Sequence, residues 1–363
     1  MSGKSENKYI LRLFAVLLAA LLMVLAGCGG GQTQPTQGKK EDPKEKGKPI
    51  KMVITHEVST THWKHGYMER YTKLVEERTG GRVKCELYPS SQLFSDRDAV
   101  AALGTGSVQM VWPVSVNVEP LNEAYGIINM PYTLTDEIMQ KNPQFKSDLM
   151  KFLSAQVESK NIKVMGLIRT SNYIFIFKSR ETTGPDDLKG LKIRVTGGQV
   201  VLDWLKEIGC SPIGMPASEM STALTQGIID GILTSPQGWV EIVGSAAKTG
   251  MDCGSLVIST YSALVDNKWW EGLPPDIQKI LQDSFDELAA DQWQYSIDED
   301  RKAMEKAKNQ LKAKVHNETK EDEALWLART KPAIDRFAAK HPDAFKKFVD
   351  LNEKYGRKYP PVK

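Results

Sequence analysis

Arg194 stands where an arginine can act on a bound molecule. It lies near the end of the apolar segment 191–195, shortly before Gly197 and Gly198. A short apolar strand that leads through glycines into a helical pattern is typical of an α/β sheet, whose ligand sites lie beyond the carboxyl ends of the strands. A guanidinium presents a planar fork of N–H groups that matches a carboxylate. The chemistry available here is carboxylate recognition, and the alternative is an arginine whose charged head lies in solvent.

A second group of reactive side chains lies in the polar loop 56–62, which contains His56, Glu57 and His62. Histidine and glutamate are zinc ligands, so a metal-dependent extracytoplasmic hydrolase is one interpretation. A zinc helix of the H-E-x-x-H type needs its second histidine three residues after the glutamate, and His62 stands farther along. We therefore expect a polar loop that binds no metal.

Motifs that would build a nucleophile or a phosphate site are missing. The chain contains no G-x-S-x-G and no P-loop, and Gly104-Thr105-Gly106 continues as Ser-Val-Gln instead of completing G-x-G-x-x-G. We expect no catalytic residue and no cofactor.

The composition describes a water-soluble globular chain of about two domains. Its 363 residues are 41% hydrophobic and 26% charged, too polar for a protein with many membrane spans and too apolar for a disordered one. The first fifty residues carry the surplus behind the net charge of +3, and the remainder is close to neutral. Proteins that bind nucleic acids carry a basic surplus, so we expect no nucleic-acid partner.

The N-terminus has the pattern of an export signal that ends in a lipid-attachment cysteine. Basic residues precede the apolar run 13–26, which is shorter than a mature membrane helix needs. The run leads into Leu-Ala-Gly-Cys at Cys28, which resembles the bacterial lipoprotein box. That resemblance implies cleavage of a signal peptide, residues 1–27, and acylation of Cys28 as a membrane anchor. An ordinary cleaved signal with an unrelated cysteine is the alternative.

Residues 28–50 are expected to form a flexible tether, because the segment from Gly29 to Lys48 has no large apolar side chain. Three cysteines follow in the body of the chain, at positions 85, 210 and 253. Their odd number and the absence of C-x-x-C spacing argue against a disulfide framework or a zinc site. We expect them to be small buried residues.

The body of the chain alternates strand-like and helix-like segments in two groups, which favours two α/β lobes with largely parallel sheets. The first group is 49–55, 63–79, 82–88, 96–104 and 108–113, and the second is 163–168, 173–177, 192–195, 199–208, 211–214 and 218–227. The last third instead predicts one helix, Pro275–Val315, of roughly 60 Å. Its apolar stripe fades, so we expect a strut across both lobes and not a coiled-coil arm.

Five segments, in this order along the chain, resemble motifs of the solute-binding proteins of tripartite ATP-independent periplasmic (TRAP) transporters. They are 79–93 (TGGRVKCELYPSSQL), 130–132 (MPY), 186–195 (DDLKGLKIRV), 215–231 (MP, then E, ALTQG and DG) and 267–275 (NKWWEGLPP). The similarity covers essentially residues 51–350. It implies an α/β, two-lobed periplasmic-binding-protein-like fold with a long helix spanning both lobes. We expect 51–171 and 258–300 in lobe I, and 172–257 and 301–363 in lobe II.

The resemblance also implies roles for particular residues. In the family, the arginine at the place of Arg194 grips the ligand's carboxylate. Many members carry a second arginine near the place that Tyr173 occupies here. Arg169 lies several residues upstream, and it either contacts the ligand in place of that arginine or caps a strand. Tyr173 is a candidate for the same site.

The chain departs from the family after Asp-Gly, where members often continue QENP and this chain continues ILTSP. The hydroxyl of Thr234 or Ser235 is expected to replace the missing side-chain amide, and Trp239 to line the cleft with an apolar face. In the first lobe, Glu57 lies in the loop where members present polar groups to the ligand. Trp112 ends its strand at a similar place, where it belongs either to the site or to the core.

The function implied is that of an extracytoplasmic solute-binding protein, anchored in the periplasm or at the cell surface through Cys28. It would capture an organic acid between its lobes by hinge closure and deliver it to the TRAP membrane permease, which an ion gradient drives. A ligand-binding sensor lipoprotein that docks on a membrane receptor is the alternative.

Overall fold

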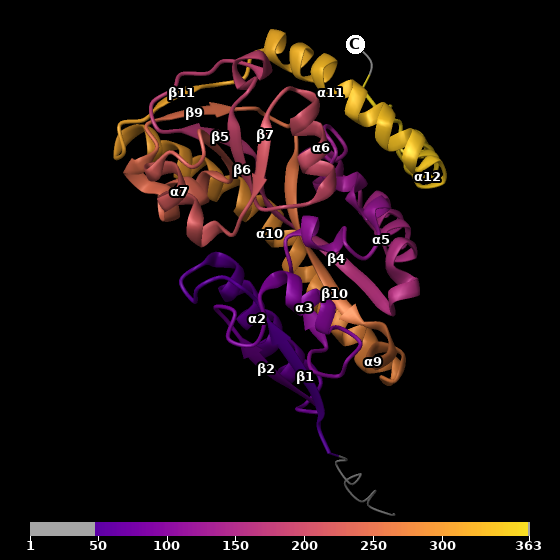
Figure 1. Ribbon diagram of the computed structural model, residues 1–363. Helices are drawn as coiled ribbons and strands as arrows, with labels where there is room; N and C mark the ends of the chain where they lie inside the picture. Colours follow the sequence, from indigo (N-terminus) through magenta and orange to yellow (C-terminus); the bar gives the residue numbers. More distant parts are fainter. Residues whose placement is uncertain (1–47, 362–363) are drawn as a thin grey trace, which may run out of the picture. The chain divides into compact units, whose positions relative to one another are not determined.

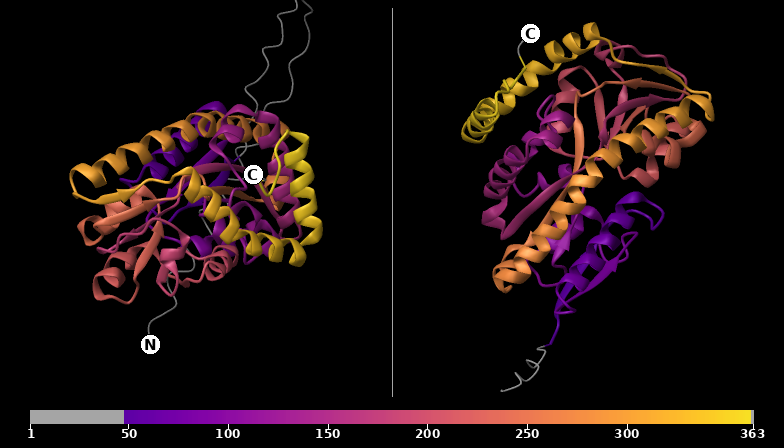
Figure 2. Two further views of the ribbon diagram at one scale, coloured as in Figure 1. Left: turned by 90° about the horizontal axis from the view of Figure 1, so that it is seen from above. Right: turned by 180° about the vertical axis from the view of Figure 1, so that it is seen from behind.

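The computed structural model describes residues 48–361, which form two β-sheets flanked by helices, with one long helix running past both (Figures 1 and 2). The predicted two-lobed α/β fold is confirmed. The predicted signal peptide 1–27, Cys28 and almost all of the tether 28–50 lie outside the described residues. Among the helices of residues 48–361, none combines the length and the apolar character that a membrane span requires.

The first lobe is built on a five-stranded sheet. The strand order is β2 (Val83–Tyr88), β1 (Ile50–Thr55), β3 (Met110–Val111), β10 (Ile258–Asp266) and β4 (Ile162–Asn172). β1 pairs in parallel with β2 and β3, and β10 runs antiparallel to β3 and β4. The carboxyl ends of the parallel strands therefore meet at one edge, where the loop after β1 begins.

The second lobe is built on a six-stranded sheet. The strand order is β11 (Lys314–His316), β9 (Thr249–Asp252), β5 (Ile174–Phe177), β8 (Gly231–Thr234), β6 (Lys192–Val195) and β7 (Ser211–Gly214). β8, β6 and β7 are parallel neighbours, whereas β5 runs antiparallel to β8 and β9. Arg194 thus lies near the carboxyl end of an inner strand, flanked by two parallel partners.

Helices of several lengths cover the sheets. In the first half of the chain they are α2 (Trp63–Arg78), α3 (Asp96–Ala102), η2 (Ser115–Val118), η3 (Glu123–Asn129), α4 (Asp136–Lys141), α5 (Pro143–Val157), η4 (Glu158–Lys160) and η5 (Pro185–Leu188). In the second half they are α6 (Gln199–Glu207), η6 (Ala217–Glu219), α7 (Met220–Gln226), α8 (Pro236–Gly238), η7 (Trp239–Val243), η8 (Gly244–Ala246), α9 (Asn267–Glu271), α10 (Pro275–Asn309), α11 (Lys320–Lys340) and α12 (Pro342–Lys354).

The long helix α10 contacts both lobes. It packs on β4 and α2 of the first lobe and on α8 and η7 of the second. It ends at Asn309, six residues before the predicted end, so the prediction of helix through Val315 was wrong. The chain turns through Lys312, at φ 55°, and residues 314–316 pair with β9 instead. Pairing with a sheet edge satisfies the backbone hydrogen bonds that further helix would have satisfied.

The chain crosses between the sheets at three places. Tyr173 links β4 directly to β5, residues 253–257 lead back from β9 to β10, and α10 passes along both. The Tyr173 amide donates to the Val257 carbonyl at 3.1 Å, so the first two crossings lie side by side. Adjacent crossing strands of this kind form a natural hinge.

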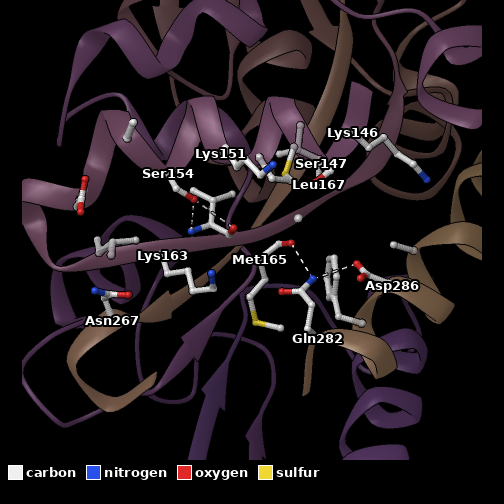
Figure 3. A pocket seen from close by; sticks show the side chains of 18 of the residues that line it. Lys146, Ser147, Lys151, Ser154, Lys163, Met165, Leu167, Asn267, Gln282 and Asp286 are labelled. Atoms are coloured by element: carbon white, nitrogen blue, oxygen red, sulfur yellow. Dashed lines mark hydrogen bonds between the residues drawn. The ribbon is translucent and has the colours of Figure 1, made fainter. Parts of the chain in front are cut away.

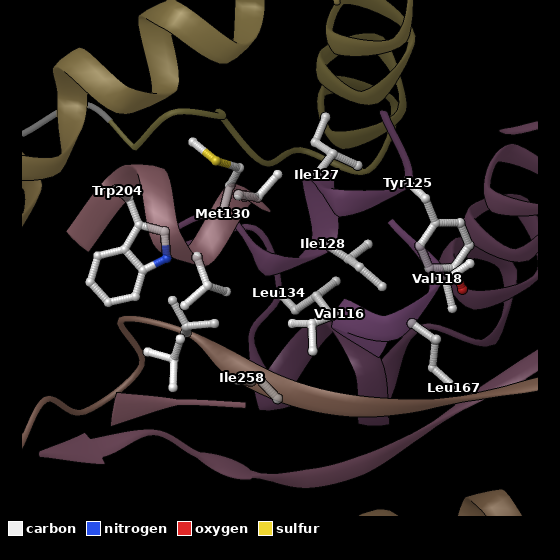
Figure 4. Packing of buried hydrophobic residues seen from close by; sticks show 14 of the residues in the cluster. Val116, Val118, Tyr125, Ile127, Ile128, Met130, Leu134, Leu167, Trp204 and Ile258 are labelled. Atoms are coloured by element: carbon white, nitrogen blue, oxygen red, sulfur yellow. The ribbon is translucent and has the colours of Figure 1, made fainter. Parts of the chain in front are cut away.

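A continuous apolar core also joins the lobes beside α6. Trp204 of α6 belongs to the same apolar cluster as Val116, Ile128 and Met130 of the first-lobe segment 116–134 (Figure 4). At the start of α6, the Val200 amide donates to Glu119 Oε2 at 3.0 Å, so a first-lobe carboxylate caps this second-lobe helix. The cores of the two lobes are therefore not independent on this side.

The body cysteines are free thiols. Cys210 and Cys253 are buried, as predicted for small apolar residues, whereas Cys85 in β2 is half-buried.

Candidate ligand-binding site

Arg194 is a buried cation with little to neutralise it. Its side chain is 1% exposed, and its Nε and Nη2 groups donate to a single acceptor, the Met215 carbonyl, at 3.1 and 2.8 Å. In the described part of the chain, no carboxylate lies within ion-pair distance of it, and burial lowers the pKa of its guanidinium to about 10. A buried charge without a counter-charge is costly, so this arginine is prepared for an anion.

Tyr173 lies close to Arg194. It occupies the crossing between β4 and β5, half-buried, and each group affects the other electrostatically. Burial raises the pKa of the Tyr173 hydroxyl, while the Arg194 charge acts in the opposite direction. A neutral hydroxyl beside the guanidinium is able to donate to the same anion.

On the first-lobe side, Glu57 forms an ion pair with a lysine that sequence reasoning missed. Lys64 Nζ lies 2.6 Å from Glu57 Oε2 and 4.0 Å above the centre of the Tyr261 ring, and its side chain is fully buried. Lys64 stands in the first turn of α2, where a lysine usually reaches into solvent, and no sequence signal marked it as buried. The interaction with the tyrosine ring is a cation–π contact.

Asp96 completes this cluster, and the sequence marked it only as the first residue of a helix. Burial and the neighbouring Glu57 carboxylate raise its pKa well above the usual range. Although burial alone would raise the pKa of Glu57, the charge and the hydrogen bond of Lys64 lower it to about 2. The two carboxyl groups therefore differ: the Lys64 ammonium favours the ionised form of Glu57, whereas burial favours the neutral form of Asp96.

The histidines of the loop after β1 are neutral and belong to local structure. Burial, together with the Lys64 charge, lowers the pKa of His56 to about 3 and that of His62 to about 4. His62 accepts a hydrogen bond from the Lys64 amide as the N-cap of α2, and His56 Nε2 lies 3.0 Å from His65 Nδ1. Within residues 48–361, no set of three potential ligands converges on a metal position.

The loop after β8 supplies a side-chain amide, although the chain lacks the QENP motif of the family. Thr234 is buried at the end of β8, and Ser235 accepts from the Gly238 amide at 2.9 Å as the cap of α8. Gln237 follows, and its Oε1 accepts from Trp63 Nε1 of the first lobe at 2.9 Å. The expectation that a hydroxyl replaces the amide is therefore incomplete, because Gln237 brings an amide to the face between the lobes.

Arg169 does not belong with these residues. It is 2% exposed, and four of its guanidinium N–H groups already have acceptors. Those acceptors are Asp136, Ser296, Asp300 and Asn172, at 2.8, 3.0, 2.6 and 3.0 Å. We correct the expectation of a ligand contact, because these bonds tie β4 to α4 and α10 and leave at most one donor.

Trp112 and Trp239 are core residues. Of the two interpretations of Trp112 the structure favours the core, and the expectation that Trp239 lines the cleft is corrected. Trp112 is 1% exposed and packs against Tyr71 and Phe285. Trp239 is fully buried, donates to the Ala247 carbonyl at 3.3 Å and covers Gly250 of β9. Their large apolar surfaces stabilise each lobe internally.

A hollow of 710 Å³ lies elsewhere, between α5, β4 and α10 of the first lobe (Figure 3). Its rim carries lysines and carboxylates in balance, namely Lys146, Lys151, Lys163, Glu158, Glu271 and Asp286. On its floor, Ser154 and Gln282 hydrogen-bond the backbone of β4 at Val164 and Met165. These side chains cover the free sheet edge. The hollow involves only one lobe and offers an anion no net charge, so we place the candidate site at Arg194.

Known proteins resemble this chain over most of its length. Residues 54–341 match the profile of the bacterial extracellular solute-binding proteins, family 7 (DctP). The C4-dicarboxylate-binding periplasmic protein DctP of Rhodobacter capsulatus is 28% identical over 293 residues, covering 80% of this chain and 87% of that protein. The C4-dicarboxylate-binding protein DctB of Bacillus subtilis is 23% identical over 337 residues, covering 88% and 94%.

Solved structures of TRAP periplasmic solute-binding proteins share the fold. The protein from Desulfovibrio salexigens with bound orotic acid superposes with a TM-score of 0.76 at 22% identity, covering 85% of this chain and 99% of that one. The protein from Anaerococcus prevotii with bound glucuronate gives 0.73 at 22% identity, covering 84% and 99%. Because the family profile spans most of the chain and its motifs occur in order, this chain belongs to the bacterial extracellular solute-binding proteins of family 7, the DctP family.

Proposed function

We propose that this protein captures an organic acid outside the cytoplasm and delivers it to a TRAP-type membrane permease. The single observation that supports this most is Arg194, a buried guanidinium with one carbonyl acceptor and, among residues 48–361, no carboxylate partner. A ligand carboxylate would accept charge-assisted hydrogen bonds from the other N–H groups of that fork. Relatives described as binding dicarboxylates, glucuronate and orotic acid agree with an acidic ligand.

The ligand would be held between the lobes. Arg194 and Tyr173 approach it from the second lobe and the hinge, while Glu57 and Trp63 belong to the first-lobe loop and helix that face them. A ligand that touches both lobes favours the closed arrangement, because it makes more contacts there than in an open one. The predicted division into 51–171 with 258–300, and 172–257 with 301–363, is our proposal for the parts that move.

Anchoring and delivery complete the proposal. Acylation of Cys28 would hold the protein at a membrane through its lipid chains, close to a permease that accepts the closed form. Replacement Cys28→Ser is then expected to release the protein from the membrane fraction of a bacterial host. The family consists of solute-binding proteins, and we propose no catalytic activity and no cofactor.

The test begins with thermal-shift screening of organic acids, since a ligand that binds the folded state raises its melting temperature. Calorimetry with the best acid then compares the wild type with Arg194→Ala and with Lys192→Ala, an exposed neighbour on the same strand. Loss of the arginine is expected to cost about 2–5 kcal/mol of binding free energy, as for a buried charge pair that loses one partner. The Lys192 variant is expected to bind as the wild type does.

Two results would contradict the proposal. Unchanged affinity in a folded Arg194→Ala protein would remove the guanidinium from the site. A screen in which only metals or nucleotides raise the melting temperature would remove the organic acid altogether.

A further inference from the structure

The charged groups on the two sides of the candidate site differ in a way that bears on the ligand. On the second-lobe side, Arg194 is a buried cation whose hydrogen-bond acceptor is a carbonyl. On the first-lobe side, the buried cation Lys64 already has Glu57 at 2.6 Å, and Asp96 stands beside that pair. One side therefore lacks an anion, and the other already holds a carboxylate for its cation.

Electrostatic interactions relate the two sides. The Lys64 ammonium lies over Tyr261, which interacts electrostatically with Glu57, Asp96 and Tyr173. Tyr173 in turn lies beside Arg194. Tyr261 therefore lies by the first-lobe cluster, and Tyr173 lies near the second-lobe arginine.

The two lobes also approach each other directly at this place. A methyl group at Gly197, just after β6, would lie 4.0 Å from the Nη2 atom of Arg97, the residue next to Asp96. On the other side of the site, Trp63, next to Lys64, bonds Gln237 across the lobes. The cluster of Glu57, Lys64 and Asp96 thus lies where the second lobe faces the first.

The cluster is unsuited to a second negative charge. Lys64 has its counter-ion, and Asp96 uses Oδ2 to accept from the Val114 amide at 3.0 Å. A ligand carboxylate here would meet the Glu57 carboxylate, and such like-charge contacts select against a partner. A hydroxyl group would instead donate to the carboxylate oxygens and accept from the ammonium.

We propose that the ligand is a polyhydroxylated monocarboxylate, such as a sugar acid, with its carboxylate on Arg194 and its hydroxyl groups toward Glu57, Lys64 and Asp96. This inference rests on the proposed function, because it assumes that the ligand lies between the lobes. It separates the chain from relatives whose names state dicarboxylate binding. It is consistent with the relative that holds glucuronate.

Matched six-carbon acids test the inference with the full-length protein. Aldonic and uronic acids carry one carboxylate and several hydroxyl groups, the corresponding aldaric acids replace the far end with a second carboxylate, and adipate has two carboxylates and no hydroxyl. Calorimetry is expected to show that at least one aldonate or uronate binds ten-fold or more tightly than its aldarate, and that adipate binds more weakly still.

The outcomes separate the two proposals. An aldarate or adipate that binds as tightly as the monocarboxylates would overturn the sugar-acid inference and leave the organic-acid function standing. If no acid of the wider screen binds at all, the proposed function itself fails.

Variants of the cluster test which residues set this preference. Glu57→Gln removes the counter-ion of Lys64, so the ratio of aldarate to aldonate affinity is expected to rise at least ten-fold. Asp96→Asn keeps an acceptor for the Val114 amide and is expected to weaken aldonate binding without raising aldarate binding. The matched control is Glu86→Gln, which removes an exposed carboxylate of β2 that pairs with Lys51 of β1. It should leave both affinities unchanged. A folded Glu57→Gln protein with the wild-type ratio would contradict the assignment.

Discussion

Trp63 and Gln237 form a direct hydrogen bond between the lobes, in which the indole Nε1 donates to the side-chain amide oxygen at 2.9 Å. Trp63 begins α2 in the first lobe, and Gln237 lies in α8 of the second. The indole also packs edge-on against Tyr67 and Tyr261. Its position is therefore held by the first lobe, while its one donor reaches the second.

Trp63→Phe is expected to weaken ligand binding about five-fold, because it removes the donor and keeps an aromatic ring. A hydrogen bond of this kind contributes about 1 kcal/mol, and the bond favours the closed arrangement of the lobes. Calorimetry on Trp63→Phe, Gln237→Leu and the double variant measures the effect. The double variant should lose no more binding free energy than either single variant. Fully additive losses of binding free energy would show that the two residues act separately.

Arg169→Met is expected to lower the free energy of unfolding by about 3–5 kcal/mol, because it leaves Asp300 and Asp136 without their buried partner. Urea unfolding measures this loss. The control is Arg301→Met, which removes an exposed arginine paired with Asp298 on α10, the helix that carries Asp300. It should lower the free energy of unfolding by less than about 1 kcal/mol. Ligand affinity of folded Arg169→Met should match the wild type. If Arg169→Met bound the ligand more weakly but unfolded like the wild type, Arg169 would be a ligand-binding residue after all.

Glu119 makes stability depend on pH. Burial raises the pKa of this carboxyl group to about 7, although hydrogen bonds from Val200 and Asn129 act against the rise. Between pH 4.5 and 7 the folded state therefore holds a proton that the unfolded state releases, so its contribution to stability is lost as the pH rises. Glu119→Gln should remove this part of the slope, because the amide does not titrate.

Chemical unfolding of both proteins at several pH values checks this prediction. Asp300, whose pKa burial raises to about 6, contributes a slope of the same sign, so the difference between variant and wild type is the quantity to compare. Glu77→Gln, an exposed change on α2, should leave the slope unchanged. Parallel pH profiles for Glu119→Gln and wild type would contradict the assignment.

Local sequence patterns predicted most of the elements near the site. β6 and β7 lie at the predicted residues, 192–195 and 211–214, and α2 begins at Trp63 and ends one residue before its predicted end. Gly80 and Gly81 stop α2 with positive φ angles, as glycines do at helix ends. Such features depend on neighbours along the chain, so the sequence alone reveals them.

Some residues of the site were predictable from the sequence, and others are placed only by tertiary packing. Arg194 was predictable, because a strand end, two glycines and a family motif surround it within ten residues. Lys64 and Asp96 were not, since their cluster with Glu57 forms only when β1, α2 and α3 pack together. Gln237 likewise acquires its partner from the other lobe.

The sequence by itself thus determined the order of strands and helices, the family and the strand that carries the anion-binding arginine. The tertiary structure decided which charged and aromatic side chains are buried. Arg169 and Trp239 have the residue types of a binding site. Arg169 is instead held by ion pairs with α4 and α10, and Trp239 is surrounded by the core of the second lobe. The physical reason is that the partner of a buried charge comes from distant parts of the chain, which no local pattern specifies.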